Sequence, residues 1–359
     1  MTPSQDQRET LCNAVREARA QGLKLRIRGG SSKDFLVDAS LDALQPLDVT
    51  GHCGVVDYEP SELVITARCG TPLAEIQTIL DAGGQMLPFE PPAFGPDATL
   101  GGMISAGLSG PRRPYASAVR DAVLGVQLLT GRGECLQFGG QVMKNVAGYD
   151  VSRLVTGAFG TLGVLLEVSV RVMPAPVRSI TLKQTVSARQ ALALFSGWAR
   201  QPLPVSAACH IKNTLYVRLS GGPAAVDDAA QIVGGREHAE GEALWSEIRE
   251  HRHGFFASDT PLWRLSVPPA TPPLELPGSW LLDWGGAQRW LVSDAPAIKI
   301  RATVESVGGH ATLFRHAQTG IPRFHPLPAP LARLQAQVRQ ALDPDGLFNP
   351  GHPITLGTP

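Results

Sequence analysis

Three glycine-rich stretches decide the fold: RGGSSK at residues 28–33, TLGGMISAGLSG at residues 99–110 and GAFGTLG at residues 157–163. The first follows an alternating segment that is expected to be a strand. Its small residues let backbone N–H groups converge on a phosphate, and its serine and lysine side chains add donors. In the other two, closely spaced glycines leave bare backbone for a close approach. Taken alone, the first stretch is more readily interpreted as a polar turn and the third as close packing of a helix against a strand, and the second is also compatible with a helix packed tightly on a sheet.

The two best-known glycine-rich nucleotide motifs do not fit this chain. A Rossmann fingerprint has the form G-x-G-x-x-G. The G-x-G of this chain is Gly131-Arg-Gly133, and Leu136 stands where the third glycine belongs. A Walker A loop, G-x-x-x-x-G-K followed by Ser or Thr, is also absent. The sequence therefore argues against a nicotinamide cofactor on a Rossmann domain and against a P-loop.

The segments around these stretches predict a mixed α+β domain, because alternating residues indicate strands and apolar residues three or four apart indicate helices. We expect Ser4 to cap the opening helix, which ends at Gly22, and Thr71 to cap the helix that begins with Pro72. The expected strands are 24–28, 55–58, 63–69, 122–130, 134–138 and 165–172, and the expected helices are 4–22, 71–80 and 149–157.

From about Val177 the pattern changes to strands that alternate with helices, which predicts a second α+β layer. Residues 327–341 are expected to form an amphipathic helix with Leu331, Leu334, Val338 and Leu342 on one face. The other expected strands are 180–186, 215–219, 263–267, 280–284 and 290–293, and the other expected helices are 188–200, 224–233, 241–252 and 295–307.

Composition excludes several classes of protein. A chain of 359 residues suits two domains better than one. Its 32 basic and 32 acidic residues give a formal net charge of zero, so no nucleic acid or anionic membrane partner is expected. Its 5 cysteines are widely spaced without C-x-x-C, which argues against a disulfide scaffold, a zinc ribbon and an iron–sulfur cluster. With no signal peptide and no long apolar stretch, we expect a cytoplasmic protein without a membrane span.

The three stretches and FNPG at residues 348–351 occur in the order of a known family. Together they resemble the PCMH-type FAD-binding domain of the vanillyl-alcohol-oxidase flavoproteins. PDATLGGMI at 96–104, GLSGPRRPY at 107–115 and VMKNVAGYD at 142–150 resemble the FAD-binding subunits of bacterial glycolate oxidases in particular. The resemblance implies an α+β fold with three parts: an FAD-binding domain of two α/β lobes at 1–176, an antiparallel-sheet cap domain at 177–326, and a C-terminal segment at 327–359 that returns to the FAD domain.

The resemblance also implies where FAD is bound. The first loop and the Thr-Leu-Gly-Gly segment would hold the diphosphate and run beside the isoalloxazine, and backbone of the third stretch would line the ribityl and adenine end. Several family members attach FAD covalently to a histidine in the first loop, where this chain has none, so noncovalent FAD is expected. The expected FAD-binding residues are Arg28, Gly29, Gly30, Ser31, Ser32, Lys33, Pro88, Thr99, Leu100, Gly101, Gly102, Ser105, Ala106, Ser109, Gly110, Arg112, Tyr115, Asp121, Gly160, Gly163, Val164 and Asn349.

A small 2-hydroxy acid requires a cation for its carboxylate and a base near its carbinol. The candidates for these roles are Lys144, Tyr149, Arg315 and His316. Arg112, Arg113, Arg323 and His325 are further candidates, and the two arginines at 112 and 113 are equally suited to a phosphate. Asp121 and Asp150 are more readily interpreted as backbone caps than as proton carriers.

No metal site is expected. Related 2-hydroxy-acid dehydrogenases carry H-x-G-D-G-N-x-H near the C-terminus, which supplies a substrate-binding metal site and a base. This chain has no such segment, and its late histidines, His310, His316, His325 and His352, are scattered. His251 and His253 are two residues apart on an expected helix, where their side chains diverge, so they are expected to be solvated.

These observations predict an FAD subunit of a glycolate-oxidising complex that makes glyoxylate and passes electrons to an iron–sulfur partner. A sister flavoprotein subunit is the other expected partner. Because the metal segment is missing, one hypothesis places the oxidation of glycolate in that sister subunit. Two alternatives remain open from the sequence: a stand-alone flavin oxidase of another small alcohol, and a flavin-free structural subunit. Any attachment to the inner membrane is expected to be made through the partner subunits.

Overall fold

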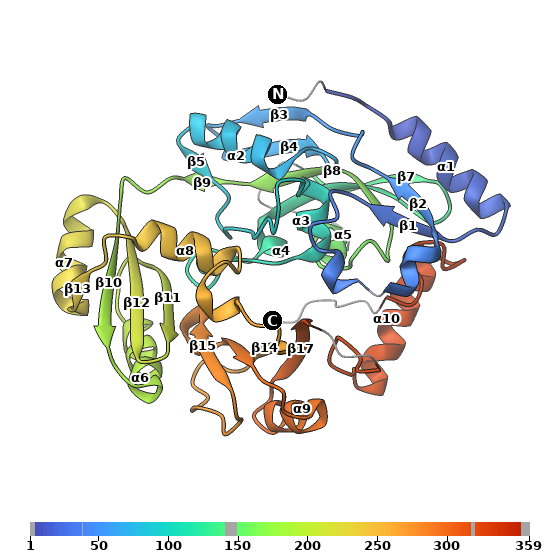
Figure 1. Cartoon of the computed structure of the whole chain (residues 1–359). Coiled ribbons are helices and arrows are strands. Elements are labelled where there is room, and N and C mark those ends of the chain that lie inside the picture. Colours follow the sequence, from blue (N-terminus) through green and yellow to red (C-terminus); the bar gives the residue numbers. More distant parts are fainter. Residues whose placement is uncertain (1–3, 38, 141–148, 317–319, 353–359) are drawn as a thin grey trace. The chain divides into compact units, whose positions relative to one another are not determined.

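The structure is a computed structural model that describes residues 4–37, 39–140, 149–316 and 320–352 (Figure 1). It divides into two compact units. The first contains Met1–Ser109, Ala118–Ala175 and Pro326–Thr358, and the second contains Gly110–Ser117 and Pro176–His325. The short segment Gly110–Ser117, which the sequence analysis assigned to the first domain, thus groups with the second unit.

The first unit is built on a five-stranded antiparallel sheet in the order β3-β4-β8-β6-β7. The predicted hairpin around Gly131-Arg-Gly133 is present, since Leu129 of β6 pairs with Cys135 of β7. Two small pairs accompany the sheet: β1 with β2, which are parallel, and β5 with β9. The strands are β1 (Leu25–Arg28), β2 (Gln45–Asp48), β3 (Val55–Glu59), β4 (Val64–Arg68), β5 (Gln85–Met86), β6 (Val123–Leu129), β7 (Cys135–Gly139), β8 (Val164–Arg171) and β9 (Met173–Pro174).

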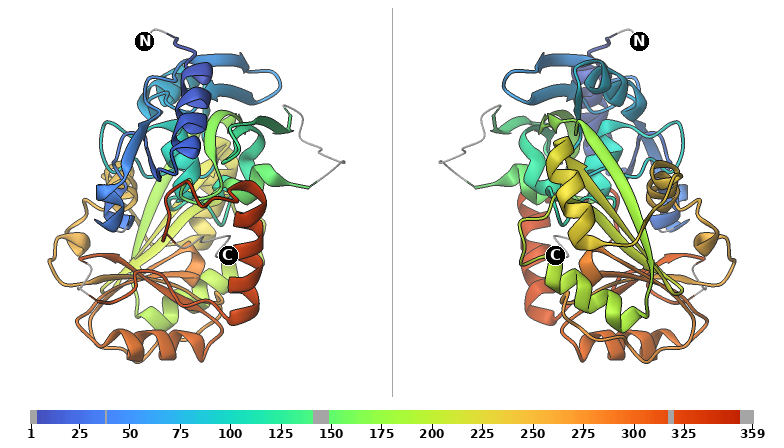
Figure 2. Two further views of the ribbon diagram at one scale, coloured as in Figure 1. Left: turned by 90° about the vertical axis from the view of Figure 1, so that its right-hand side faces the viewer. Right: turned by 90° about the vertical axis from the view of Figure 1, so that its left-hand side faces the viewer.

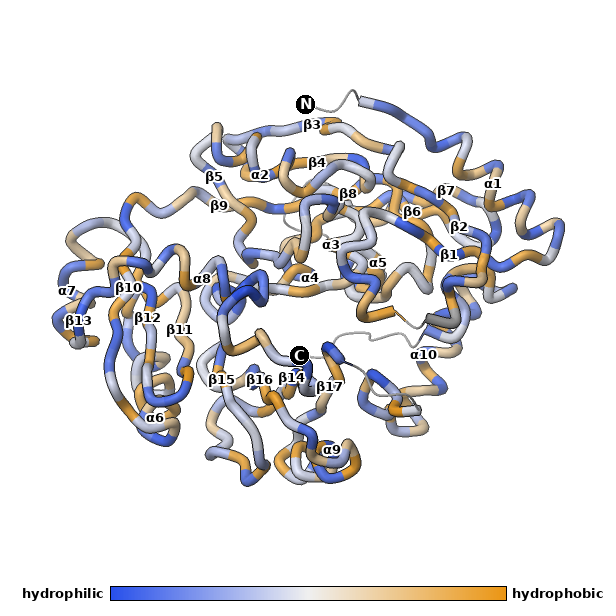
Figure 3. The backbone as a smooth tube through the Cα atoms, viewed as in Figure 1, coloured by the Kyte–Doolittle hydropathy of each residue, from blue (hydrophilic) through white to orange (hydrophobic). Residues whose placement is uncertain are grey.

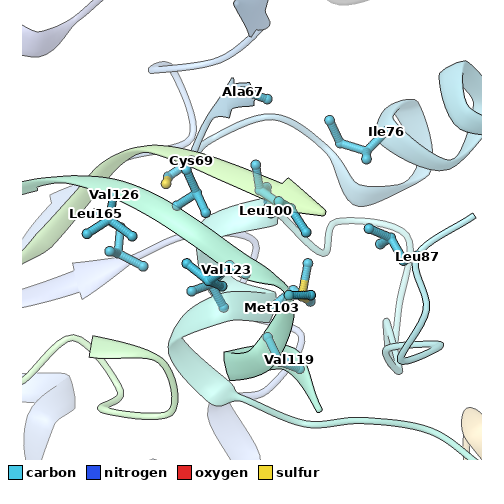
Figure 4. Packing of buried hydrophobic residues seen from close by; sticks show 14 of the residues in the cluster. Ala67, Cys69, Ile76, Leu87, Leu100, Met103, Val119, Val123, Val126 and Leu165 are labelled. Atoms are coloured by element: carbon cyan, nitrogen blue, oxygen red, sulfur yellow. The ribbon is translucent and has the colours of Figure 1, made fainter. Parts of the chain in front are cut away.

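Both faces of this sheet are covered by apolar clusters. On β8, Leu165 and Val168 belong to the larger cluster, whereas Val164 and Leu166 belong to the other. Figure 4 shows side chains of the strands and of α2 and α3 gathered in the larger cluster. The second cluster includes the apolar face of α1, whose remaining residues are mostly hydrophilic (Figure 3). The helices of this unit are α1 (Arg8–Ala20), η1 (Asp34–Leu36), η2 (Ala39–Ala43), α2 (Leu73–Ala82), α3 (Leu100–Ala106), α4 (Val119–Ala122), α5 (Val151–Val155) and α10 (Ala329–Leu342).

The first two helices start differently from the prediction. The N-cap of α1 is Gln7 and not Ser4, and no side chain caps it. Pro72 is the N-cap of α2, and the hydroxyl of Thr71 donates to Arg68 O at 2.6 Å instead of capping. The same hydroxyl accepts a hydrogen bond from Gly54 N at 2.8 Å, so Thr71 fixes a turn before the helix.

The second unit contains an eight-stranded antiparallel sheet in the order β13-β10-β12-β11-β15-β16-β14-β17. An antiparallel α+β layer was predicted here, but the strands β11, β13 and β17 were missed. The strands are β10 (Arg178–Thr185), β11 (Val205–Ile211), β12 (Thr214–Gly221), β13 (Arg236–Glu237), β14 (Leu262–Ser266), β15 (Ser279–Asp283), β16 (Gln288–Val292) and β17 (His310–Arg315).

Helices cover this second sheet from both sides. Leu182 of β10 lies in the cluster that includes α6 and α7, whereas its neighbour Thr181 accepts a hydrogen bond from Trp245 Nε1 of α8 at 2.9 Å. Since successive strand residues point to opposite faces, α8 lies on the other side. Helix α9, orange in Figure 2, packs with β14 and β17. The helices are α6 (Ala188–Trp198), α7 (Pro223–Val233), α8 (Gly241–Arg249), η3 (Gly254–Phe256), η4 (Trp284–Gly286) and α9 (Ala297–Glu305).

The predicted C-terminal helix is present as α10, but its apolar face is only partly covered. Val338 and Leu342 pack against the larger cluster of the first unit, whereas Leu331 and Leu334 are exposed. No helix within the described parts of the chain is long and apolar enough to cross a membrane.

Candidate cofactor-binding groove

The three glycine-rich stretches meet in one groove of the first unit. The first stretch follows β1, the second contains the whole of α3, and the third leads into β8. The residues that line the groove are Ile27, Gly29, Gly30, Ser31, Ser32, Lys33, Asp34, Val37, Val49, Cys69, Thr99, Gly101, Gly102, Ser105, Ala106, Phe159, Gly160, Gly163, Val164, Leu165 and Asn349.

The loop after β1 is held tightly against the residues that precede α3. A Cβ atom at Gly30 would lie 1.4 Å from Asp97 O, so only glycine fits there. Ser31 has a φ of 54°, and Asp34 N donates to Ser31 O at 3.1 Å to close the turn into η1. A left-handed residue inside a glycine-rich loop is the backbone arrangement from which anion-binding nests are built.

The side chain of Lys33 makes hydrogen bonds within the protein. Its side chain is buried, and its ammonium donates to Ala93 O at 3.1 Å and to Ser32 Oγ at 3.2 Å. Lys33 therefore joins the loop to the segment before α3, while its charge still lies in the groove wall. The positive charge contributes to the anion preference of the groove even where its hydrogen bonds are internal.

The second stretch both packs tightly as a helix and exposes bare backbone, so both interpretations of its glycines are confirmed. It forms α3, whose N-cap Thr99 accepts a hydrogen bond from Gly102 N at 3.1 Å. A Cβ atom at Gly101 would lie 2.7 Å from the Cβ of Cys69, so the helix packs closely on β4 and its following turn. Gly101 and Gly102 also line the groove, so tight packing and a bare wall occur together.

The third stretch is joined to the first by the C-terminal segment. Asn349 Oδ1 accepts from Ile27 N at 3.0 Å, and its Nδ2 donates to Phe159 O at 2.7 Å. Gly160 has a φ of 70°, and a Cβ atom there would lie 3.0 Å from Asn349 Nδ2. A single side chain thus connects the end of β1 to the turn that precedes β8.

The position of Asn349 depends on a buried carboxylate. Asp343 accepts hydrogen bonds from Leu347 N at 2.8 Å and Phe348 N at 2.9 Å. Burial raises the pKa of Asp343, although these two hydrogen bonds oppose the shift. Arg339 Nη2 donates to Phe348 O at 2.7 Å, so the tail is fixed through its backbone from two sides.

Several expected FAD-binding residues do not line the groove. Leu100 is buried in the apolar cluster, and Asp121 accepts a hydrogen bond from Ala118 N at 3.1 Å, as expected of a cap. Gly110, Arg112 and Tyr115 belong to the second unit. The full set outside the groove is Arg28, Pro88, Leu100, Ser109, Gly110, Arg112, Tyr115 and Asp121.

Sequence reasoning also missed part of the lining. The missed residues are mostly apolar, and all except Phe159 lie outside the three glycine-rich stretches, although Ile27 and Leu165 occupy strand positions next to them. Strand alternation around those stretches was the one signal that pointed to them. The missed residues are Ile27, Asp34, Val37, Val49, Cys69, Phe159 and Leu165.

The expected catalytic residues are divided between the two units, and their roles stay predictions. Lys144 lies outside the described residues. Tyr149 belongs to the first unit and is 93% exposed. Arg315 ends β17 in the second unit, where burial lowers its pKa, and the adjacent His316 is exposed with a φ of 54°.

The further cation candidates have partners within the second unit. Arg323 Nη1 donates to Leu313 O at 2.9 Å, and His325 Nε2 lies 2.8 Å from Glu305 Oε1. Arg113 has its guanidinium 4.4 Å from the centre of the Trp284 ring. Arg112 is buried.

His251 is not a solvated surface residue, contrary to the prediction. Helix α8 ends at Arg249, and His251 has a φ of 55° that turns its ring onto Phe256, with centroids 4.0 Å apart. Burial and the positive charge of Arg315 lower its pKa well below the usual value. His253 accepts a hydrogen bond from Phe255 N at 3.1 Å. Within the described ranges, no three His, Cys, Asp or Glu residues gather as a metal site.

Several known proteins are similar to this chain, some in sequence and others in fold alone. Residues 5–139 match the family described as FAD binding domain. The glycolate oxidase subunit GlcE of Escherichia coli is 47% identical over 346 residues, which cover 96% of this chain and 97% of that protein. The glycolate oxidase subunit GlcD of Bacillus subtilis is 30% identical over 128 residues, or 36% of this chain and 27% of that protein. A solved alkyldihydroxyacetonephosphate synthase has the same fold, with a TM-score of 0.67 at 14% identity, covering 96% of this chain and 76% of its own.

Proposed function

The chain belongs to the family of the glycolate oxidase subunit GlcE, and from this membership we propose that it serves a complex that oxidises glycolate to glyoxylate. It is an FAD-dependent oxidoreductase with a PCMH-type FAD-binding domain and acts on CH–OH groups. The observation that carries the proposal is the groove of the first unit, where three glycine-rich stretches and Asn349 come together.

The groove suits FAD in its chemistry. The loop around Ser31 offers backbone N–H groups to a diphosphate, and the apolar residues Ile27, Val164 and Leu165 offer a surface to flat rings. When bound, FAD supplies the acceptor for the hydride of the carbinol. The residues proposed to hold it are Gly29, Gly30, Ser31, Ser32, Lys33, Thr99, Gly101, Gly102, Ser105, Ala106, Gly160, Gly163, Val164 and Asn349.

Noncovalent attachment is part of the proposal. The first loop has Ser31, Ser32 and Lys33, whose side chains do not form stable bonds to flavin carbons. Cys69 lines the groove, but burial raises the pKa of its thiol strongly, so the thiolate required for attack is suppressed. The cofactor should therefore leave the protein on denaturation.

The partners are proposed from the relatives and from electron flow. The E. coli relative is named as one subunit of a glycolate oxidase, and the B. subtilis relative as another. A sister flavoprotein subunit and an iron–sulfur subunit are the expected partners here. Reduced FAD must pass its electrons onward, and an iron–sulfur protein accepts them one at a time. We expect the assembly in the cytoplasm, with any membrane attachment made by partners.

We further propose that glycolate is oxidised mainly in the sister subunit. Arg323 and His325, which could have bound a carboxylate, are instead engaged with Leu313 and Glu305. Arg315 and His316 remain as the candidates for a substrate site in this chain, together with Tyr149 and Lys144. The relay role and the catalytic role differ in one respect that can be measured, which is whether glycolate reduces the flavin of this chain alone.

Two measurements test the proposal. The visible absorption spectrum of the purified chain, taken before and after acid precipitation, should show flavin that is released into the supernatant. A colourless protein that takes up no added FAD would contradict the cofactor assignment, and flavin in the pellet would contradict noncovalent attachment.

Anaerobic glycolate should then bleach the flavins of the assembled complex quickly and those of the isolated chain slowly. Fast bleaching of the isolated chain would refute the relay role, and steady peroxide production from it would favour a stand-alone oxidase.

A further inference from the structure

Two cysteines that are far apart in the sequence lie in contact in the first unit. The sulfur of Cys12, on α1, is 2.9 Å from the sulfur of Cys135, the first residue of β7. Both are free thiols. A disulfide bond is about 2.05 Å long, so the two sulfurs need to move by less than an ångström to form one.

The helix that carries Cys12 is fastened on both sides of this contact. Arg16 Nη2 donates to Gly133 O at 3.0 Å, in the turn that leads to Cys135. Arg8 Nη2 donates to Glu167 Oε1 of β8 at 2.8 Å. The contact therefore lies between two anchors, and the thiols meet without rearrangement of the backbone.

The two thiols differ in access, which assigns them different roles in an exchange reaction. Cys135 is exposed, whereas Cys12 is buried in the apolar cluster under α1. Burial and the hydrogen bond to Cys135 raise the pKa of Cys12 to about 11. Cys135 is thus the thiol that a reagent reaches first, and Cys12 is the resolving thiol that reacts once its neighbour is modified.

We propose that Cys12 and Cys135 are a modification site that forms a reversible disulfide with low-molecular-weight disulfides as the oxidant. The thiolate of Cys135 attacks one sulfur of the small disulfide, which forms a mixed disulfide and expels one small thiolate. The sulfur of Cys12 then attacks the sulfur of Cys135, and a second small thiolate leaves. The two protein thiols lose two electrons and two protons, and the small disulfide is reduced to two thiols. Excess reductant reverses both steps.

The experiment uses the full-length chain with its cofactor, and oxidised glutathione as the probe. After incubation and removal of the reagent, the intact mass should fall by the mass of two hydrogen atoms. Peptide mapping without reduction should recover one linked pair, which contains Cys12 and Cys135. The modified chain should unfold several degrees higher, because the bond closes a long loop with a sequence separation of 123 residues. Dithiothreitol should restore the original mass.

Two variants separate the steps. Cys12→Ala should stop at a stable glutathione adduct on Cys135, and Cys135→Ser should not react. Because Cys135 is exposed, its replacement leaves the fold intact even if that of Cys12 does not. A wild-type chain that keeps all of its thiols, or that accumulates the adduct without resolving it, would overturn the proposal. A linked pair that contains Cys53, Cys69 or Cys209 would also overturn it.

Discussion

Replacing Asn349 with alanine tests the central feature of the groove, the side chain that connects β1 to the third stretch. Its Oδ1 accepts from Ile27 N at 3.0 Å and its Nδ2 donates to Phe159 O at 2.7 Å. Asn349→Ala leaves both backbone groups without these bonds in a place where Asn349 itself is buried. Each buried group left without a partner costs about 1–3 kcal/mol.

The backbone adds a further cost. Asn349 has a φ of 41°, a left-handed conformation that asparagine tolerates better than alanine, and alanine loses about 1 kcal/mol there. We therefore expect Asn349→Ala to lower the free energy of unfolding by about 3–7 kcal/mol. This is a large share of the roughly 5–15 kcal/mol that stabilises a typical folded protein. FAD should also bind more weakly, because the loop at 29–33 and the turn at 160 are no longer tied together.

Asn349→Asp separates hydrogen bonding from size. A carboxylate can still accept from Ile27 N, but its second oxygen faces Phe159 O and repels it. Protonation restores a donor, so the folded state raises the pKa of the new carboxyl above its unfolded value of about 3.9. The stability gained by protonation is present below that unfolded value and is lost as the pH rises through the folded value.

Urea unfolding at several pH values, with and without FAD, measures these effects. Asn13→Ala is the matched control, because Asn13 is exposed on α1 and its loss should change stability by less than about 0.5 kcal/mol. If Asn349→Ala unfolds like the control and holds FAD like the wild type, the connecting role is refuted. If Asn349→Asp has the same pH dependence as the wild type, the assignment of Nδ2 to Phe159 O is wrong.

Three other perturbations follow from the structure. Gly30→Ala would place a Cβ atom 1.4 Å from Asp97 O and should abolish flavin absorbance, whereas Gly197→Ala, which meets no atom within 4 Å, should retain it. Burial lowers the pKa of His310 to about 4, below its unfolded value of about 6.5, so stability present above pH 6.5 is lost as the pH falls towards 4. His310→Gln should reduce that loss by up to about 3 kcal/mol in urea titrations, and an unchanged pH profile would contradict it. Trp284→Phe removes a buried 3.0 Å hydrogen bond to a backbone carbonyl and should lower the free energy of unfolding by about 1–3 kcal/mol, measured by calorimetry; a neutral result would contradict this.

The strands that the sequence predicted are those marked by alternating residues or by flanking turn residues, although β8 among them is buried on both faces. The β6–β7 hairpin and β8 were found because turn residues and alternation marked them. Strand β11 was missed because polar and apolar residues do not alternate in its sequence, VSAACHI, which is buried on both faces from Ser206 to Ile211. Burial on both faces is a consequence of the helices that pack on the sheet, and a single strand does not encode where those helices lie.

The sequence predicted the lining residues of the groove where the fold requires glycine, because bare backbone is needed there. It did not predict the lining residues that contribute only an apolar side chain. Glycine at position 30 is dictated by the close approach of Asp97 O, and this leaves a mark in the sequence. Val37 and Val49 line the same groove, but valine is compatible with any buried position. His251 shows the same limit in the second unit, since its burial depends on a helix that ends at Arg249 without a glycine to mark the end.

The groove depends on the end of the chain as well as its beginning. The match to the FAD binding domain covers residues 5–139, which include the first two glycine-rich stretches. The third stretch and Asn349 lie beyond it, and Asn349 bonds to both the first and the third. Folding of the first stretch into a binding loop is therefore coupled to the return of residues 343–349, which Asp343 and Arg339 hold in place. A relative that aligns only within residues 5–139 shares the first two glycine-rich stretches of the groove. Its remaining wall must be formed by residues outside that alignment.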